Sequence, residues 1–221
     1  MNVINYIHAF FDDSAHWSGY DGIPTRLWEH VQYSLEALAI AAAIGLPIGL
    51  LTGHYGRGGN VLSLVATAGR ALPTFGLLVV TTLALGFGML PVMIPLVVLA
   101  VPPILVTTYE AMRSVDPPPV DAARGMGMRE SDILLRVELP VALPLILGGL
   151  RSAAIQIVST ATIAAYVSLG GLGRYIVDGL YQHNYEKVVG GATLVAGMAL
   201  ATLGLFWVAG RAAVSPGVRR G

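Results

Sequence analysis

Five long stretches of mostly apolar residues alternate with shorter polar segments along the chain. They cover approximately residues 28–52, 60–86, 91–113, 139–167 and 187–210. A helix of about 20 apolar residues is long enough to cross the hydrocarbon core of a bilayer. The pattern therefore predicts an all-α membrane protein with five transmembrane helices, which together form a transmembrane domain over residues 28–210.

Basic residues are distributed unequally between the two ends of these predicted helices. Cytoplasmic loops of membrane proteins are richer in lysine and arginine than the loops on the opposite side. Arg26, Arg174 and Lys187 lie on one side. The other side holds Arg57, Arg113, Arg124, Arg129, Arg136, Arg211, Arg219 and Arg220. We therefore expect an extracytoplasmic N-terminal segment over residues 1–27 and a cytoplasmic tail over residues 211–221.

The N-terminal segment does not have the pattern of a signal peptide. No basic region and no unbroken apolar core precede Asp12 and Asp13. Its apolar residues could form one face of a short helix at the membrane surface, and a loosely ordered tail is the alternative. These residues are Val3, Ile4, Ile7, Phe10 and Phe11.

The composition agrees with a membrane protein and excludes several other classes. Of the 221 residues, 55% are hydrophobic and only 12% are charged, whereas soluble domains are about 25% charged. The absence of cysteine excludes a disulfide scaffold, thiol catalysis and cysteine-ligated metals. A net charge of zero without a basic stripe argues against nucleic-acid binding. The histidines are scattered at positions 8, 16, 30, 54 and 183, so we predict no metal site.

Small residues recur every four positions in two of the predicted helices. Gly45, Gly49 and Gly53 do so in the first, and Gly197 and Ala201 do so in the last. Such a face allows a second helix to approach closely. We expect both faces to pack against helices of the same chain.

The segment between the third and fourth helices predicts a short cytoplasmic helix of its own. Asp116 is a plausible N-cap, and the three prolines that follow it fit a first helical turn. Gly127 would end the helix. Further along, the chain reads Val137-Glu138-Leu139-Pro140, just where the fourth apolar stretch begins.

The spacing of these residues resembles the cytoplasmic signature of type I ABC-importer permeases. That signature is Glu-Ala-Ala, three residues, Gly, nine residues, Ile, any residue and Leu-Pro. This chain keeps every spacing and replaces Glu with Asp and Ile with Val. The resemblance implies that residues 117–127 form the coupling helix, which docks on an ATPase subunit. It also implies the coupling residues, which are Asp121, Ala122, Ala123, Gly127, Leu139 and Pro140. The two alanines are small enough for a partner surface to approach closely.

Further segments resemble the short permeases that import osmoprotectants such as glycine betaine, choline and carnitine. They cover residues 22–30, 44–50, 101–105, 125–128 and 137–140. Gly170-Gly171-Leu172-Gly173 is also similar, but methionine-importer permeases share it. The resemblance implies the methionine-permease-like five-helix core, a homodimer or heterodimer of permease chains, an ATPase dimer and an extracytoplasmic solute-binding protein.

This chain itself is predicted to be a transport subunit without catalytic residues or cofactors. It lacks a GxxxxGK[ST] phosphate-binding loop, so ATP and Mg²⁺ would be bound by the partner ATPase. Two alternatives remain open. The cargo could be methionine or another amino acid, or the chain could be a membrane sensor or assembly factor that does not transport.

Polar residues on one face of the fourth helix are candidates for the translocation path. They are Ser152, Gln156, Ser159 and Thr160, and hydrogen bonding between helices is the alternative explanation. Tyr166 is a further candidate, because quaternary ammonium groups bind to aromatic faces. Gly170, Gly171 and Gly173 follow this helix and are candidates for an outer gate or a contact with the binding protein.

A charge costs about 2.5–3.5 kcal/mol at the centre of the bilayer, so charged residues within predicted transmembrane helices need an explanation. Glu36 lies in the first helix, Arg70 in the second and Arg151 in the fourth. They could form an ion pair or face a polar path. Alternatively, helices that project beyond the bilayer would place Arg70 and Arg151 near the membrane surface.

Overall fold

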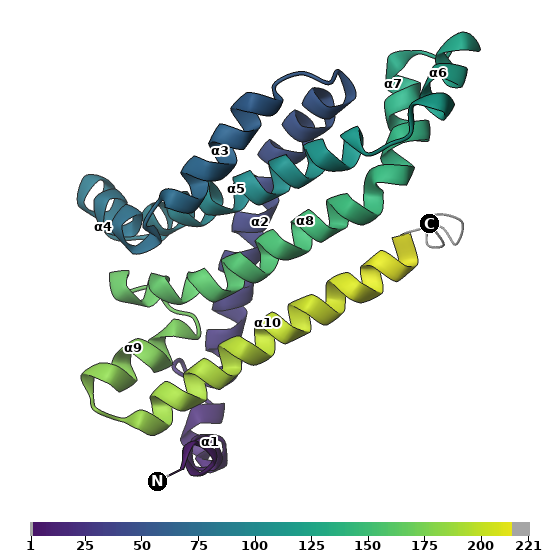
Figure 1. Ribbon diagram of the computed structural model, residues 1–221. Helices are drawn as coiled ribbons and strands as arrows, with labels where there is room; N and C mark the ends of the chain where they lie inside the picture. Colours follow the sequence, from purple (N-terminus) through teal and green to yellow (C-terminus); the bar gives the residue numbers. More distant parts are fainter. Residues whose placement is uncertain (1, 214–221) are drawn as a thin grey trace.

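The computed structural model describes residues 2–213, and within this range the chain consists of helices joined by short loops (Figure 1). Residues 214–221 of the predicted cytoplasmic tail lie outside the described part. The α-helices are α1 Val3–Asp12, α2 Ile23–His54, α3 Gly59–Ala71, α4 Thr74–Leu85, α5 Met89–Arg113, α6 Pro117–Gly125, α7 Glu130–Ile133, α8 Leu139–Thr160, α9 Gly173–Tyr181 and α10 Tyr185–Ala213. Three further turns are helical, namely η1 Ser14–Trp17, η2 Leu134–Glu138 and η3 Ala161–Val167.

In the described part of the chain, four helical segments are long and apolar enough to cross a membrane. They are Ile23–His54, Met89–Arg113, Glu130–Val167 and Tyr185–Ala213. The third of these joins α7, η2, α8 and η3 without a break, so the helix predicted from residue 139 in fact begins nine residues earlier, at Glu130. The first helix likewise begins at Ile23 rather than at residue 28.

The predicted transmembrane helix over residues 60–86 is not one straight helix. It consists of α3 and α4, and the two parts Gly59–Gly69 and Thr74–Leu85 meet at an angle of 84°. The break follows from Pro73, because proline disfavours a helical backbone in the residue before it. Leu72 is accordingly extended, with φ −72° and ψ 122°. Residues 2–213 therefore contain five candidate transmembrane helices only if this bent pair counts as one.

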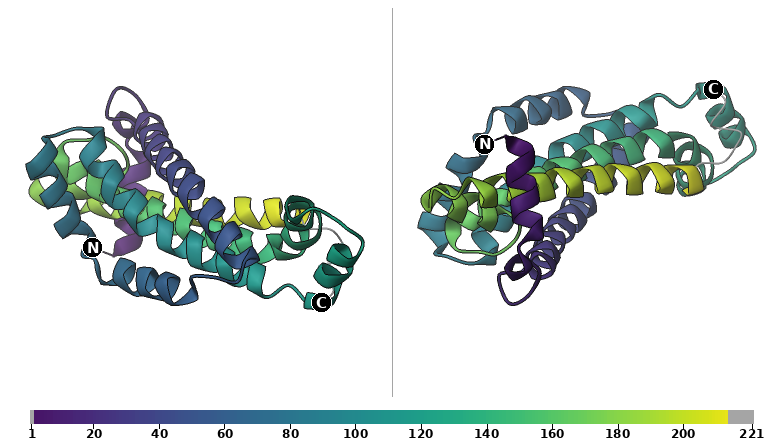
Figure 2. Two further views of the ribbon diagram at one scale, coloured as in Figure 1. Left: turned by 90° about the horizontal axis from the view of Figure 1, so that it is seen from above. Right: turned by 90° about the horizontal axis from the view of Figure 1, so that it is seen from below.

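The long helices form a layered bundle that α2 crosses at a steep angle. In Figure 1, α3, α5, α8 and α10 follow one another from top to bottom. The main core lies where α2, α5 and α8 meet, and α4 and η3 add to it. Its fully buried members include Ala37, Ala41, Leu96, Ala100, Ile104, Ala153 and Ile157. Helices α6 and α7 project from one end of the bundle (Figure 2).

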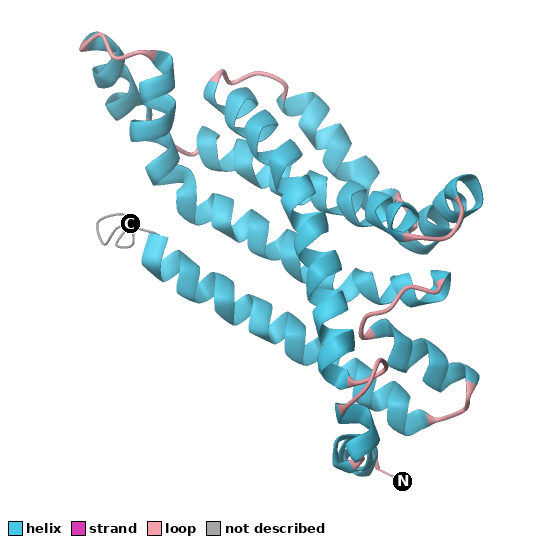
Figure 3. Cartoon of the chain, turned by 180° about the vertical axis from the view of Figure 1, so that it is seen from behind, coloured by secondary structure: helices cyan, strands magenta, loops and turns pink. Residues whose placement is uncertain are grey.

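The opposite end of the bundle carries α1, α9 and several of the connecting loops (Figure 3). Phe10 of α1 is fully buried, and its ring lies edge-on to Tyr175 of α9 at a centroid distance of 5.2 Å. A Cβ atom added to Gly190 of α10 would lie 2.1 Å from the Phe10 ring. The N-terminal segment is thus a packed helix rather than a loosely ordered tail.

The glycine face of α2 packs directly against α5, as the sequence predicts. A Cβ atom added to Gly49 would lie 2.7 Å from Cβ of Thr108, and one added to Gly53 would lie 2.5 Å from Cβ of Met112. In α10 the prediction is wrong at Gly197, where an added Cβ atom meets no atom within 4 Å. Ala201 lines an apolar pocket together with residues of α2 and α8.

Replacing Gly49 with leucine is expected to destabilise the protein. The side chain would force α2 away from α5, and overpacking of this kind costs about 1–3 kcal/mol. Thermal unfolding in detergent should show a lower midpoint for Gly49→Leu. The matched variant Gly197→Leu, which adds the same side chain in open space, should keep the midpoint of the unmodified protein. Equal midpoints for both variants would contradict the close packing of α2 on α5.

Candidate functional site

The predicted coupling helix is α6, at the projecting end of the bundle. Asp116 takes the N-cap position, although its side chain makes no capping hydrogen bond. The helix ends at Gly125, two residues before the predicted end, because Gly127 adopts a left-handed conformation with φ +80°. The amide of Gly127 donates to the carbonyl of Arg124 at 2.9 Å, and that of Met128 donates to the carbonyl of Ala123 at 3.1 Å. This is a Schellman motif, in which glycine adopts the left-handed conformation at little conformational cost.

The residues of the signature separate into buried and exposed positions. Val120, Ala123 and Ile133 form a small buried cluster that holds α6 against α7. Ala123 is 2% exposed, so the expectation that it lets a partner approach closely is wrong. Asp121 and Ala122 are exposed and remain available to a partner.

The end of the signature connects this loop to the bundle. Leu139 packs against a buried cluster that includes Ala111 of α5 and Ile146 of α8. Pro140 is exposed where η2 continues into α8, and its missing N–H group cannot donate to the carbonyl of the preceding turn. The wide π-turn of η2 lies just before it, with the amide of Leu139 donating to the carbonyl of Leu134. Leu139 thus connects the end of the signature to the bundle.

Charged side chains link α6 to α7. The guanidinium of Arg124 donates to both carboxylate oxygens of Glu130, at 2.9 and 3.2 Å. It also lies 3.8 Å from the carboxylate of Asp121. Both carboxylates favour the charged guanidinium, and the hydrogen bonds to Glu130 contribute most to the raised pKa of Arg124.

A histidine that the sequence did not single out lies behind this group. His54, the last residue of α2, has a side chain that is 2% exposed. Its Nδ1 lies 2.5 Å from Oε2 of Glu138, and its Nε2 lies 3.0 Å from Oε2 of Glu130. Within residues 2–213, no group of three or more histidine and acidic side chains is arranged to hold a metal ion. Nothing in the sequence indicates that His54 meets acids 76 and 84 positions away.

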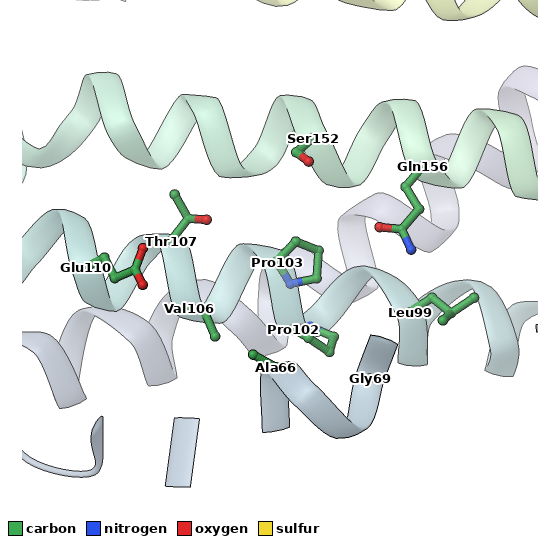
Figure 4. A pocket seen from close by; sticks show the side chains of 10 residues that line it. All are labelled: Ala66, Gly69, Leu99, Pro102, Pro103, Val106, Thr107, Glu110, Ser152 and Gln156. Carbon is green, nitrogen blue, oxygen red and sulfur yellow. The ribbon is translucent and has the colours of Figure 1, made fainter. Parts of the chain in front are cut away.

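A polar cleft of about 300 Å³ lies between α3, α5 and α8 (Figure 4). Ser152 and Gln156, two of the predicted path residues, line it from α8. Thr107 and Glu110 line it from α5, and the carboxylate of Glu110 points into it (Figure 4). The remaining described lining residues are Ala66, Gly69, Leu99, Pro102, Pro103 and Val106.

The two prolines in the wall of the cleft each interrupt a helical hydrogen bond of α5. A proline has no N–H group, so the carbonyl four residues earlier loses its partner in the helix. Pro102 and Pro103 lie inside α5 and thereby leave the carbonyl groups of Val98 and Leu99 without the usual helical donor.

The other predicted path residues lie beyond the cleft. Ser159 and Thr160 end α8, and Tyr166 follows in η3. The Tyr166 ring lies edge-on to the ring of Phe75 of α4, with a centroid distance of 5.2 Å, and both rings are about half exposed. The fold thus brings together two aromatic residues that are 91 positions apart in the sequence.

The glycines after η3 are fixed to the start of α2. The amide of Gly171 donates to the carboxylate of Glu29 at 2.7 Å, and the amide of Leu172 donates to Nδ1 of His30 at 3.2 Å. Because Nδ1 accepts, Nε2 of His30 carries the hydrogen and donates to the carbonyl of Val158 at 2.8 Å.

Two of these glycines have no room for a side chain. A Cβ atom on Gly170 would lie 1.9 Å from a carboxylate oxygen of Glu29, and one on Gly173 would lie 2.1 Å from the carbonyl oxygen of Thr162. Their immediate role is therefore to allow close contact, and the predicted gate or binding-protein contact stays a prediction.

Several charged residues surround this fixed segment. Arg26 pairs with Glu29 at 2.9 Å and also with Asp21. Arg174 pairs with Asp178 at 3.1 Å within α9. The hydroxyl of Tyr175 donates to the backbone carbonyl of Asp21 at 2.6 Å, and burial raises the pKa of Tyr175 to about 12. Tyr175 is therefore neutral at physiological pH.

Glu36 and Arg151 do not pair with each other, and the side chain of Arg70 lies outside the described part of the structure. The carboxylate of Glu36 accepts a hydrogen bond from Gln32 at 2.9 Å, one helical turn away. Arg151 is exposed and forms no ion pair with any described side chain. Neither residue is among the described residues that line the cleft.

Comparison with known proteins gives consistent results for sequence and fold. Residues 45–220 match the family described as binding-protein-dependent transport system inner membrane component. The carnitine transport permease protein OpuCB of Listeria monocytogenes is 31% identical, over 88% of this chain and 87% of the relative. The choline transport system permease protein OpuBB of Bacillus subtilis is 30% identical, over 88% and 90%.

The fold is similar to that of solved ABC importers. A structure of the MetNI methionine ABC transporter in inward facing conformations contains a chain with a TM-score of 0.74 and 24% identity. The match covers 85% of this chain and 94% of that one. At this level of identity, the likeness concerns the fold.

Proposed function

The chain belongs to the family of binding-protein-dependent transport system inner membrane components, and from this premise we propose that it imports an osmoprotectant with a quaternary ammonium group. As a member of this family it is a multi-pass membrane protein and a permease subunit, not an enzyme. The proposal concerns its cargo, its partners and the residues that carry out transport.

The observation that carries the proposal is the shared cargo of the relatives. They are named for carnitine, choline and glycine betaine, and they match this chain over 78–94% of its length. Each of these solutes carries a quaternary ammonium group. Such a group is a cation without hydrogen-bond donors, so it is recognised by negative charge and by aromatic faces.

The path proposed for the cargo has both features. Glu110 carries the single formal charge among the described lining residues of the cleft, and this charge is negative. The rings of Tyr166 and Phe75 lie together further along the direction of α8 and η3. We assign Ser152, Gln156, Ser159, Thr160 and Tyr166 to the translocation path, with the cleft as its part nearest the coupling helix.

The proposed partners follow from the family and from the two ends of the bundle. The exposed face of α6 docks on an ATPase dimer, which binds ATP and Mg²⁺, whereas this chain binds no cofactor. The chain pairs with a second permease, either a copy of itself or a similar chain. The N-terminus lies outside the cell and the C-terminus inside it. A binding protein delivers the cargo at the outer end, where Gly170, Gly171 and Gly173 form the gate or the contact.

The transport cycle proposed for this assembly is alternating access. ATP closes the ATPase dimer, and the coupling helices move toward each other. The path then opens outward and receives cargo, and hydrolysis resets it.

The cargo can be tested on the binding protein encoded beside this gene. Isothermal titration calorimetry with choline, carnitine, glycine betaine and methionine should show binding of at least one quaternary ammonium solute. ATP-driven uptake of the same solute into proteoliposomes that contain the full transporter should follow. Binding of methionine without binding of any quaternary ammonium solute would instead assign the chain to amino-acid import.

A further inference from the structure

His54 connects three parts of the chain that lie far apart in the sequence. It is the last residue of α2, and its ring reaches Glu138 in η2 and Glu130 in α7. Glu130 in turn accepts two hydrogen bonds from Arg124 in α6. A continuous series of polar contacts therefore runs from the end of α2 to the proposed coupling helix.

The geometry of the ring favours a firm connection. Each ring nitrogen faces a carboxylate oxygen, at 2.5 Å for Glu138 and 3.0 Å for Glu130. Hydrogen bonds that involve an ionised carboxylate are roughly twice as strong as those between neutral groups.

Burial makes the contact with Glu138 costly to break. The side chain of His54 is 2% exposed and that of Glu138 is 7% exposed. Separating them would leave a buried charge without a partner. The ring of His54 is further held by Tyr55, which lies edge-on at a centroid distance of 4.9 Å.

The same place lies directly beside the close contact of α2 with α5. Gly53, the neighbour of His54, packs against Met112 near the end of α5. A cavity of about 280 Å³ separates this contact from α6, and Asp121 and Arg124 line it together with His54 and Glu138. Contact between α6 and the end of α2 is thus made by side chains across a space rather than by continuous packing.

We propose that His54 is a positioning residue that makes α2 follow the movement of the coupling helix. The proposal rests on the proposed function, since it assumes that an ATPase moves α6. When α6 moves, Arg124 moves Glu130, and the shared contact of Glu130 and Glu138 with His54 moves the end of α2. The glycine face then transmits this displacement to α5, which lines the cleft.

The variants that test this must keep the protein folded. Replacing His54 alone would leave Glu138 buried without a partner. The double variant His54→Leu/Glu138→Met replaces both groups with apolar side chains, a change that is often tolerated for buried ion pairs. Glu130→Gln removes the charge of Glu130, the half-exposed partner of His54, and so weakens this contact. The contact of His54 with Glu138 stays in place.

The first measurement is the ratio of solute transported to ATP hydrolysed, in proteoliposomes that contain the full transporter. In the double variant we expect ATP hydrolysis to continue while the ratio of solute transported to ATP hydrolysed falls about tenfold. Coupling between distant sites typically changes an affinity by roughly 5–150-fold, and the expected fall lies within this range. Glu130→Gln should give a smaller fall. A double variant that is folded, assembled and transports with the unmodified ratio would overturn the proposal.

The second measurement does not depend on the cargo. The chain has no cysteine, so Leu51→Cys on α2 and Met126→Cys at the end of α6 can carry a pair of spin labels. In the otherwise unmodified transporter, the distance between the labels should stay the same when ATP and vanadate are added, because the two helices move together. In the double variant this distance should change. If it stays unchanged there too, His54 does not couple the helices, even if the proposed cargo is correct.

Discussion

Replacing Ala122 with tryptophan is expected to abolish ATP-driven uptake while leaving the permease folded. Ala122 is exposed on α6, beside the buried Ala123 that fixes this helix to α7. An indole at this position would hold a partner surface away from α6 without disturbing the small core of the loop. A loss of about 2.7 kcal/mol in association already corresponds to roughly a hundredfold weaker binding. Co-purification of the ATPase with the permease should therefore fall together with uptake.

The matched control is Ala15→Trp, which places the same side chain at an exposed alanine in η1, at the opposite end of the bundle. It should leave both ATPase association and uptake unchanged. Thermal unfolding of the two variants should match that of the unmodified permease. If Ala122→Trp retains uptake and binds the ATPase normally, α6 does not dock on the ATPase through this face.

Features that depend on neighbouring residues were predictable from the sequence. The apolar stretches predict five transmembrane helices, and four of these match unbroken helices to within a few residues at most ends, because a bilayer imposes a minimum length. The position of α6 follows from breakers that act locally, namely the prolines after Asp116 and the left-handed Gly127. The glycine spacing of α2 likewise indicates close packing, although the sequence does not show that the partner is α5.

Features that depend on the tertiary structure were not predictable. Pro73 reads equally well as a kink inside one helix or as a break between two, since Pro47 and Pro144 lie inside unbroken helices of the same chain. Ala122 and Ala123 are the same residue type, yet the cluster with Val120 and Ile133 buries one of them and leaves the other exposed. The contacts of His54 with its two acids and of Tyr166 with Phe75 join residues from separate helices.

Reversing the charge at Glu110 is expected to lower the uptake of choline by about a hundredfold. Unit charges about 4 Å apart interact by roughly 1 kcal/mol in water and by roughly 4 kcal/mol near a protein surface, and Glu110→Lys turns this attraction into repulsion. Glu110→Gln removes only the attraction and should lower uptake less, by about tenfold. Choline is a simple cation, whereas carnitine and glycine betaine also carry a carboxylate, so their uptake should fall less than that of choline. Initial rates of ATP-driven uptake in proteoliposomes measure all of these effects.

Two control variants decide whether the carboxylate acts on the cargo. Glu186→Lys makes the same charge change at the start of α10, away from the cleft, and should leave uptake unchanged. Arg70 follows the lining residue Gly69 in the sequence, and its side chain lies outside the described part of the structure. If Glu110 attracts the cargo, the double variant Glu110→Gln/Arg70→Gln should transport choline as poorly as Glu110→Gln alone. If the second substitution restores uptake, Glu110 serves to neutralise an arginine, and the cleft recognises its cargo without a fixed negative charge.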